Sequence, residues 1–200
     1  MTEINRTVLV DMDNVLANFD TAAVAHLDPA EIVEREQFYV AKDYPPHIAA
    51  TIVEAYAKEY FFSNLDELPG SMEGWQAMLD VGLLPRIASA VPEVSKTGKK
   101  DKISWLNKKM VPRFGSSVVS EAIFDRNKWR YDAIVILDDN PQLAKGPDGT
   151  SLASWEQILF GWANKPKVPM AQTAFRLLDW SDPDRLITMI NEIDQAKNRS

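Results

Sequence analysis

The sequence predicts an α/β protein in which helices sandwich a parallel sheet. Residues 7–10 form an uninterrupted, β-branched apolar run, which is typical of a strand buried on both faces of such a sheet. From residue 70 onward, short apolar runs alternate with segments of helical periodicity, and short connections join them. This alternation favours a Rossmann-like sheet covered on both faces and built with right-handed crossovers.

Length and composition indicate a globular protein that binds neither membranes nor polymeric nucleic acid. Two hundred residues suit one large domain, or one domain with an insertion, and 46% of them are hydrophobic. The net charge of −7 disfavours a polyanion-binding surface, and the absence of cysteine excludes disulfides and thiolate chemistry. Two histidines without cysteine disfavour a zinc site. No apolar stretch has transmembrane length and no signal-peptide pattern is present, so we expect a cytoplasmic protein.

A mostly helical segment, residues 17–69, follows the first strand, and we call it the insertion. Asp28-Pro29-Ala30-Glu31 has the pattern of a capped helix start, and Pro45-Pro46 opens a second helix. An aromatic pair lies in the predicted connection between these helices, and Leu68-Pro69-Gly70 is a predicted hinge. We therefore predict a core domain of residues 1–16 and 70–200, with the insertion as a small helical cap domain over the strand end.

Beyond the hinge, each predicted element has a local signal. Met72, Trp75 and Leu79 share one face of a helix that Gly82 ends. The remaining apolar runs predict strands at residues 83–89, 122–124 and 133–137. A short helix is predicted at residues 155–162, and a final helix begins at Asp182-Pro183. A basic stretch is interpreted as the solvated start of a helix: Lys96, Lys99, Lys100 and Lys102.

Polar side chains follow the predicted strands at their carboxyl ends, where open α/β sheets bind ligands. Asp11 and Asp13 are two residues apart, so both point to the same side of an extended chain. Two carboxylates held close repel each other, and a divalent cation relieves that repulsion. The alternative is that these aspartates only cap the next segment. The other strand ends supply the remaining groups that phosphoryl transfer needs: Ser89, Lys128, Asp138 and Asp139.

These residues resemble the four motifs of the haloacid dehalogenase-like (HAD-like) phosphohydrolases. The first motif is Asp11-Met12-Asp13-Asn14-Val15 after a hydrophobic strand, the second is Ser89, the third is Lys128, and the fourth is Asp138-Asp139. More narrowly, the chain is similar to the 5′(3′)-deoxyribonucleotidases. That similarity rests on segments spread in order along nearly the whole chain: VDMDNVLANFD (10–20), FYVAKDY (38–44), residues 65–70, KISWLNK (102–108), DRNK (125–128), ILDDNP (136–141), SWEQILF (154–160) and residues 177–182.

The resemblance implies a HAD-like core with a cap, and a Mg²⁺-dependent phosphatase acting on small-molecule 5′-(deoxy)nucleoside monophosphates. Asp11 would be the nucleophile that forms an aspartyl-phosphate, and Asp13 would be the general acid and base. Mg²⁺ would be held by Asp11, the backbone carbonyl of Asp13 and Asp139, with Asp138 in support, while Ser89 and Lys128 would bind phosphate oxygens. Because the family forms dimers, a homodimer is one of the oligomeric states to expect.

The resemblance also assigns apolar residues of the insertion to the nucleoside. Phe19 and Phe38 match base-binding positions of the family, and Tyr39 and Val40 are adjacent. Stacking on a base contributes about 1–3 kcal/mol in nucleic-acid complexes, which is enough to affect substrate choice. From the residues alone, packing inside the cap is the commoner fate of such aromatics.

The chain departs from the family pattern in several places. Asn14 stands where the family commonly has glycine, and Ser89 replaces the usual threonine. Ala90-Val91 replaces a Ser-Pro pair, and positions 91–95 contain no lysine to match a further phosphate-binding lysine. A cap tryptophan of the family aligns near Ala55 or Tyr56. These departures bear on the choice of sugar and base more than on hydrolysis.

Other functions fit the same residues. A phosphatase of another small phosphomonoester keeps the chemistry and changes the substrate, whereas a non-catalytic nucleotide-binding protein keeps only the binding site. Phosphoryl transfer to a sugar acceptor is a further alternative. The sequence leaves open the base, the choice between ribose and deoxyribose, and the position of the phosphate.

Overall fold

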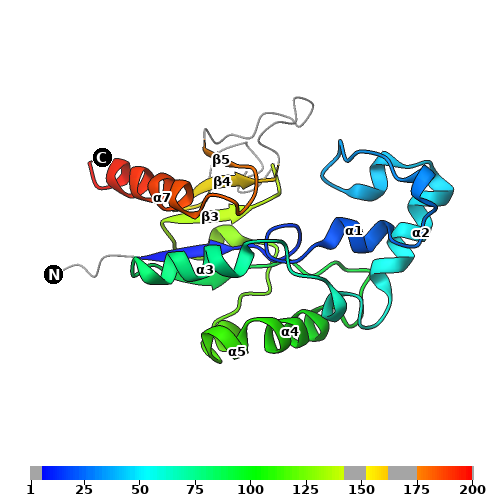
Figure 1. Cartoon of the computed structure of the whole chain (residues 1–200), viewed down its shortest axis with the longest axis horizontal. Coiled ribbons are helices and arrows are strands. Elements are labelled where there is room, and N and C mark those ends of the chain that lie inside the picture. Colours follow the sequence, from blue (N-terminus) through cyan, green and yellow to red (C-terminus); the bar gives the residue numbers. More distant parts are fainter. Residues whose placement is uncertain (1–5, 142–151, 162–174, 200) are drawn as a thin grey trace.

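The computed structural model describes residues 6–141, 152–161 and 175–199. Within them, five parallel strands form one sheet with the order β2-β1-β3-β4-β5 (Figure 1). The strands are β1 (Thr7–Val10), β2 (Leu84–Ile87), β3 (Val135–Asp138), β4 (Glu156–Phe160) and β5 (Phe175–Leu177). The predicted α/β fold with a Rossmann-like sheet is confirmed. Because β1 pairs with both β2 and β3, its carboxyl end lies beside theirs.

β1 is buried on both faces, as its apolar run predicts. Val8 and Val10 belong to the main core cluster, which includes residues of α3 (Ser71–Asp80) and α7 (Pro183–Lys197). Leu9 lies on the other face, in a second cluster with Ile136 and Trp155. The alternation follows from the two-residue period of a strand. The first carboxylate of this segment, Asp11, therefore comes where the strand ends.

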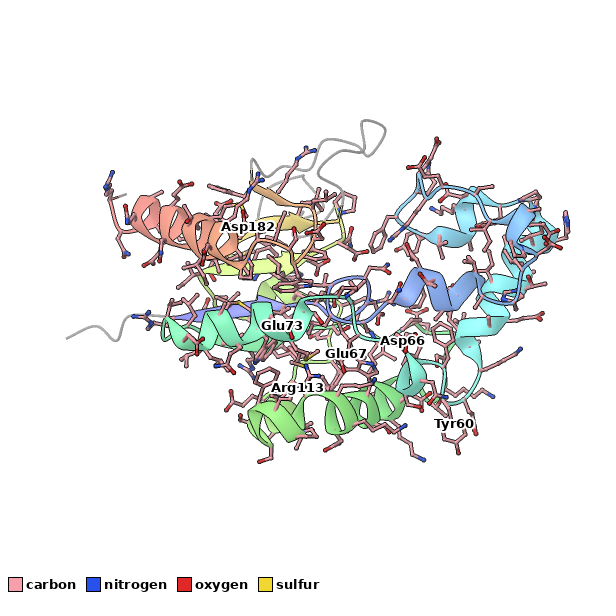
Figure 2. All side chains as sticks on the ribbon, viewed as in Figure 1. Tyr60, Asp66, Glu67, Glu73, Arg113 and Asp182 are labelled. Atoms are coloured by element: carbon pink, nitrogen blue, oxygen red, sulfur yellow. The ribbon has the colours of Figure 1, made fainter. Side chains whose placement is uncertain are left out.

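The remaining core helices follow their sequence signals. α7 begins after Asp182, whose carboxylate accepts a hydrogen bond from the backbone N–H of Arg185 at 2.9 Å (Figure 2). α3 ends at Asp80 and Gly82 follows with a φ of +75°, although the predicted apolar face is incomplete because Leu79 is exposed. After β2 come α4 (Gly98–Lys109), α5 (Val111–Phe114) and α6 (Ser117–Ser120), and η4 (Lys128–Arg130) precedes β3. None of the helices in the described ranges is long and apolar enough to cross a membrane.

Two predicted elements are wrong. The segment predicted as a helix at residues 155–162 contains the strand β4 instead, and its last residue, Trp162, lies outside the described residues. Its apolar run is buried between β3 and β5, and periodicity alone does not distinguish a short buried strand from a helix. Residues 122–124, predicted as a strand, make a single parallel bridge to Ala88 through Ile123. The Asp125 carboxylate then accepts from the backbone N–H of Asn127 at 2.8 Å, which turns the chain before a ladder forms.

The insertion has a small hydrophobic cluster of its own. It contains α1 (Phe19–Val24), η1 (Pro29–Glu31), η2 (Val40–Asp43), α2 (Pro46–Ala57) and η3 (Phe62–Asn64). Asp28 opens only a single 3-10 turn, which a capping box with Glu31 closes, whereas Pro46 opens a full helix. The cluster consists of Ala23, Val24, Val40, Tyr44 and Ile52. α1 and α2 stand to one side of the sheet (Figure 1).

The two chain segments that join the insertion to the sheet are hydrogen-bonded to each other. Ala17 forms an antiparallel bridge with Glu67, and the Leu68 N–H donates to the Leu16 carbonyl at 2.8 Å. Glu67 also pairs with Arg113 of α5 at 3.4 Å (Figure 2). Phe62 and Leu65, at the end of the insertion, are buried in the main core cluster. The last residues of the insertion therefore anchor it to the core that packs on the sheet.

Gly74 in α3 leaves the space that Trp180 fills. A Cβ at position 74 would lie 2.1 Å from Cε3 of Trp180, whose indole N–H donates to the Val15 carbonyl at 2.6 Å. We expect Gly74→Ala to lower the free energy of unfolding by about 1–3 kcal/mol, because overpacking displaces Trp180. Urea unfolding measures this. The exposed neighbour Glu73→Ala is the control and should stay within about 0.5 kcal/mol. An unchanged midpoint for Gly74→Ala would contradict the packing argument.

Candidate active site

The carboxyl ends of β1 and β3 bring three buried aspartates together. Asp11 follows β1, Asp138 ends β3 and Asp139 comes next, and one carboxylate oxygen from each lies within 4.8 Å of the others. Burial raises the pKa of Asp138 to about 7 and the pKa of Asp139 well above its ordinary value. A set of oxygen ligands at this spacing suits a hard cation such as Mg²⁺.

Lys128 lies between two of these carboxylates. Its Nζ is 2.8 Å from Asp11 Oδ1 and 2.5 Å from Asp138 Oδ2. Burial opposes its charge, but the two carboxylates hold the pKa of Lys128 above its ordinary value, so it remains an ammonium. Asp138 also accepts the backbone N–H of Asn140 at 2.8 Å. Asp138 is therefore held by two donors.

A second buried ammonium, which the sequence interpretation missed, comes from Lys102 of α4. Its Nζ donates to Asp13 Oδ2 at 2.7 Å, to Ser89 Oγ at 2.8 Å and to the Ala90 carbonyl at 2.7 Å. The interpretation of Lys102 as part of a solvated helix start is wrong, because its side chain is fully buried. The available signal was its position three residues before Trp105, a large apolar residue on the same face of the helix. Lys102 supplies a charge beside Ser89 although positions 91–95 contain no lysine.

Asp13 has one carboxylate oxygen held and the other without a partner. Lys102 binds Oδ2, whereas Oδ1 is buried and has no hydrogen-bond partner among the described residues. Burial raises the pKa of Asp13, and the nearby Lys102 offsets only part of that effect. A carboxyl group with a raised pKa and an unpaired oxygen is suited to exchange a proton with a ligand.

Residues at these strand ends and residues of the insertion line one cavity of about 410 Å³. The polar lining includes the six predicted strand-end residues Asp11, Asp13, Ser89, Lys128, Asp138 and Asp139, together with Asn14, Arg35, Arg126 and Asn140. Besides Arg35 and Ala41, the insertion contributes Phe19, Phe38, Tyr39, Val40 and Tyr56. Every residue predicted for the site thus lies at this one cavity, and of the two positions considered for a cap aromatic, Tyr56 lines it. Val40 is mostly buried in the insertion's own cluster, while Tyr39 is exposed.

The SWEQILF segment (154–160) contains β4, and two of its side chains hydrogen-bond to the backbone near the site. Trp155 Nε1 donates to the Lys128 carbonyl at 3.4 Å. Gln157 Nε2 donates to the Asn140 carbonyl at 2.8 Å and to the Asp138 carbonyl at 3.4 Å. Trp155 therefore holds the backbone before β3, which carries Lys128, and Gln157 holds the backbone at the end of β3, which carries Asp138 and Asp139.

Asn14, in the turn after Asp13, has a left-handed backbone conformation with a φ of +57°. Glycine adopts this conformation without strain, and asparagine tolerates it better than most other residues. The departure from the family pattern at this position therefore keeps the turn. The Asn14 N–H donates to the Ala17 carbonyl at 2.8 Å, which closes the loop.

The comparison with protein families identifies the family of this chain. The model of the family described as "5′ nucleotidase, deoxy (Pyrimidine), cytosolic type C protein" matches residues 5–192. The chain belongs to this family. As a member of this 5′ nucleotidase family, it is a phosphoric monoester hydrolase.

Curated relatives of this chain include 5′(3′)-deoxyribonucleotidases. The chain is 26% identical over 186 residues to the mitochondrial 5′(3′)-deoxyribonucleotidase of Mus musculus, and the match covers 88% of this chain and 81% of the relative. It is equally similar to the cytosolic 5′(3′)-deoxyribonucleotidase of Homo sapiens, with 26% identity, 88% of this chain and 89% of the relative.

Two solved HAD hydrolases share the fold. One, from Deinococcus radiodurans with bound phosphate and sodium, has a TM-score of 0.51 at 16% identity, covering 94% of this chain and 97% of that one. The other, from Bacillus subtilis and bound to magnesium, has a TM-score of 0.55 at 12% identity, covering 94% and 100%. At these identities the likeness concerns the fold alone, and it supports the HAD-like architecture of the core.

Proposed function

We propose that this family member is a Mg²⁺-dependent phosphatase that hydrolyses 5′-deoxynucleoside monophosphates through an aspartyl-phosphate intermediate. The observation that carries the proposal is one cavity lined both by a cluster of carboxylates with the Lys128 ammonium and by aromatic side chains. The charged groups suit a phosphate and the aromatic side chains suit a base. The deoxyribonucleotidases among the relatives support this choice of substrate.

Two aspartates divide the chemistry. Asp11 attacks the phosphorus and forms the aspartyl-phosphate, while the bond from phosphorus to the nucleoside oxygen breaks and Asp13 gives that oxygen its proton. Asp13 then takes a proton from water, and the water oxygen attacks the phosphorus. Phosphate leaves, and Asp11 is restored. The unpaired Oδ1 and the raised pKa of Asp13 support its assignment as the acid and base.

The other polar residues bind and neutralise the phosphate. Lys128, 2.8 Å from Asp11, offsets charge on the nucleophile and reaches a phosphate oxygen, and the Ser89 hydroxyl donates to another. The fit of three buried carboxylates to a cation supports a Mg²⁺ ion held by Asp11, Asp139 and the Asp13 carbonyl, with Asp138 in support. Bound there, the ion neutralises charge on the transferring phosphoryl group.

The insertion acts as the cap in this proposal. Phe19 contacts the rings of Tyr56 and Phe61, at centroid distances of 5.5 Å and 5.6 Å, so it packs within the insertion and lines the cavity at once. Phe38 contacts Tyr39 edge to face at 4.9 Å. These rings offer a base a preformed apolar wall.

Phosphate release from a panel of phosphomonoesters tests the function. With Mg²⁺ present, kcat/KM for 5′-deoxynucleoside monophosphates should be about tenfold higher than for sugar phosphates, because a stacked base contributes about 1–3 kcal/mol and about 1.4 kcal/mol corresponds to a factor of ten. EDTA should abolish release. Faster turnover of sugar phosphates would favour the general phosphomonoesterase, and a transfer product in place of free phosphate would indicate a phosphotransferase. Tight nucleotide binding without turnover would indicate a non-catalytic protein.

A further inference from the structure

The Asn14 carboxamide joins the sheet to the insertion. Its Nδ2 donates to Asp139 Oδ2 at 3.2 Å and to Asp20 Oδ1 at 3.0 Å, and its Oδ1 accepts from the backbone N–H of Asp20 at 3.0 Å. Glycine would satisfy the backbone angle at this position and would make none of these three hydrogen bonds. The side chain therefore has a role that the turn itself does not require.

Arg35 makes the same connection from the far part of the insertion. Its NH1 lies 2.6 Å from Asp20 Oδ2 and 3.3 Å from Asp139 Oδ2. Its Nε donates to the Gln37 carbonyl at 3.0 Å and its NH2 to the Phe38 carbonyl, and the guanidinium lies 5.6 Å from the centroid of the Phe38 ring. A planar guanidinium can bind two carboxylates and two carbonyls at once, which an ammonium on a single carbon chain cannot.

We propose that Asn14 and Arg35 are positioning residues that clamp residues 32–39, the Phe38 loop, to the carboxylate of Asp139, with Asp20 as the shared acceptor. The inference rests on the proposed function, in which Asp139 holds the ion and Phe38 contacts the base. Both donors bind the same oxygen of Asp139, Oδ2, and leave the other oxygen for the ion.

Such a clamp positions both an ion ligand, Asp139, and the Phe38 loop through one set of contacts. Hydrogen bonds from outside the ligand set orient ligating carboxylates, and their loss typically weakens metal affinity 10- to 100-fold. Arg35 at the same time holds the backbone of the Phe38 loop, which carries the aromatic wall. Ion binding and the position of the Phe38 loop are therefore coupled, so that each stabilises the other.

Two substitutions test the clamp without changing the charge of the site. Asn14→Gly removes the carboxamide and suits the backbone angle, and Arg35→Lys keeps the cation and removes the guanidinium. Hydrogen exchange across residues 32–44 in nucleotide-free protein measures the loop, and calorimetric titration with Mg²⁺ measures the ion. The control is Arg113→Lys, the same chemical change at an arginine that pairs with Glu67 away from the cavity.

We expect both variants to exchange about tenfold faster in the Phe38 loop, and Asn14→Gly to raise the Mg²⁺ dissociation constant about tenfold. Added Mg²⁺ should slow loop exchange in the wild type and should do so less in the variants. Nucleotide KM should rise more than kcat falls. Asn14→Asp keeps the size of the side chain but turns a carboxylate toward Asp20 and Asp139, so in ion-free protein it should speed exchange of the Phe38 loop more than glycine does.

Wild-type exchange and ion binding in Asn14→Gly would overturn the clamp, because Asn14 would then serve the turn alone. Faster exchange in Arg113→Lys equal to that in Arg35→Lys would overturn it as well, since the effect would not be specific to the site. Neither hydrogen exchange nor the Mg²⁺ titration uses a substrate. A failed nucleotide panel with these shifts intact would therefore contradict the proposed function and leave the clamp standing.

Discussion

Asp11→Asn is expected to lower kcat by on the order of 10⁴-fold or more, because an amide nitrogen or oxygen is a far poorer nucleophile than a carboxylate. Asparagine has nearly the same shape as aspartate, so the binding of nucleotide should change much less than turnover. Steady-state phosphate release with Mg²⁺ measures the loss. Acid-quenched wild type should also carry hydroxylamine-labile phosphate from a labelled nucleotide, and the variant should carry none.

Loss of fold would not explain such a result. Asp11 lies among like charges, and Lys128 keeps its 2.5 Å contact with Asp138 when Asp11 becomes neutral. The ion-free variant should therefore unfold at the same temperature as the wild type or higher. Asp184→Asn, an exposed site in the first turn of α7, is the matched control and should keep full activity. Near-normal turnover by folded Asp11→Asn would rule out the aspartyl-phosphate mechanism.

Lys102→Met is expected to lower kcat/KM at least about 100-fold, the usual effect of losing one preorganised donor in an active site. Lys102 holds Asp13, Ser89 and the Ala90 carbonyl together, so its removal releases the acid/base and the phosphate-binding hydroxyl at once. Lys100→Met is the same change two residues away on an exposed face of α4, and it should have no effect.

Stability has to be measured alongside, because Lys102→Met leaves the partly exposed Asp13 without its partner. Breaking a fully buried ion pair costs about 3–5 kcal/mol, so that range is the upper bound for this loss. Activity is therefore compared at a temperature where circular dichroism shows the variant folded. The double variant Asp13→Asn/Lys102→Met carries no unpaired charge and should regain part of that stability without regaining activity. Folded Lys102→Met with wild-type kcat/KM would show that Asp13 and Ser89 need no such support.

Much of the fold follows from short-range patterns. The apolar run of β1, the Pro45-Pro46 helix start and the Asp182 cap each depend on neighbours a few residues away, and each lies where the sequence predicts it. β4 was the failure. Its buried apolar run has the same composition in a strand or a helix, and pairing with β3 and β5 decides between them.

The sequence by itself determined the residue types of the site, because Asp11, Asp13, Ser89, Lys128 and the aspartate pair each follow a predicted strand and resemble family motifs. Only the tertiary structure decided which partners they have. Lys102 reaches Asp13 across 89 positions of sequence, and Arg35 reaches Asp139 across 104. No local pattern encodes contacts at that separation, because they depend on how α4 and the insertion pack against the sheet. The same packing, and not composition, separates buried Lys102 from exposed Lys100.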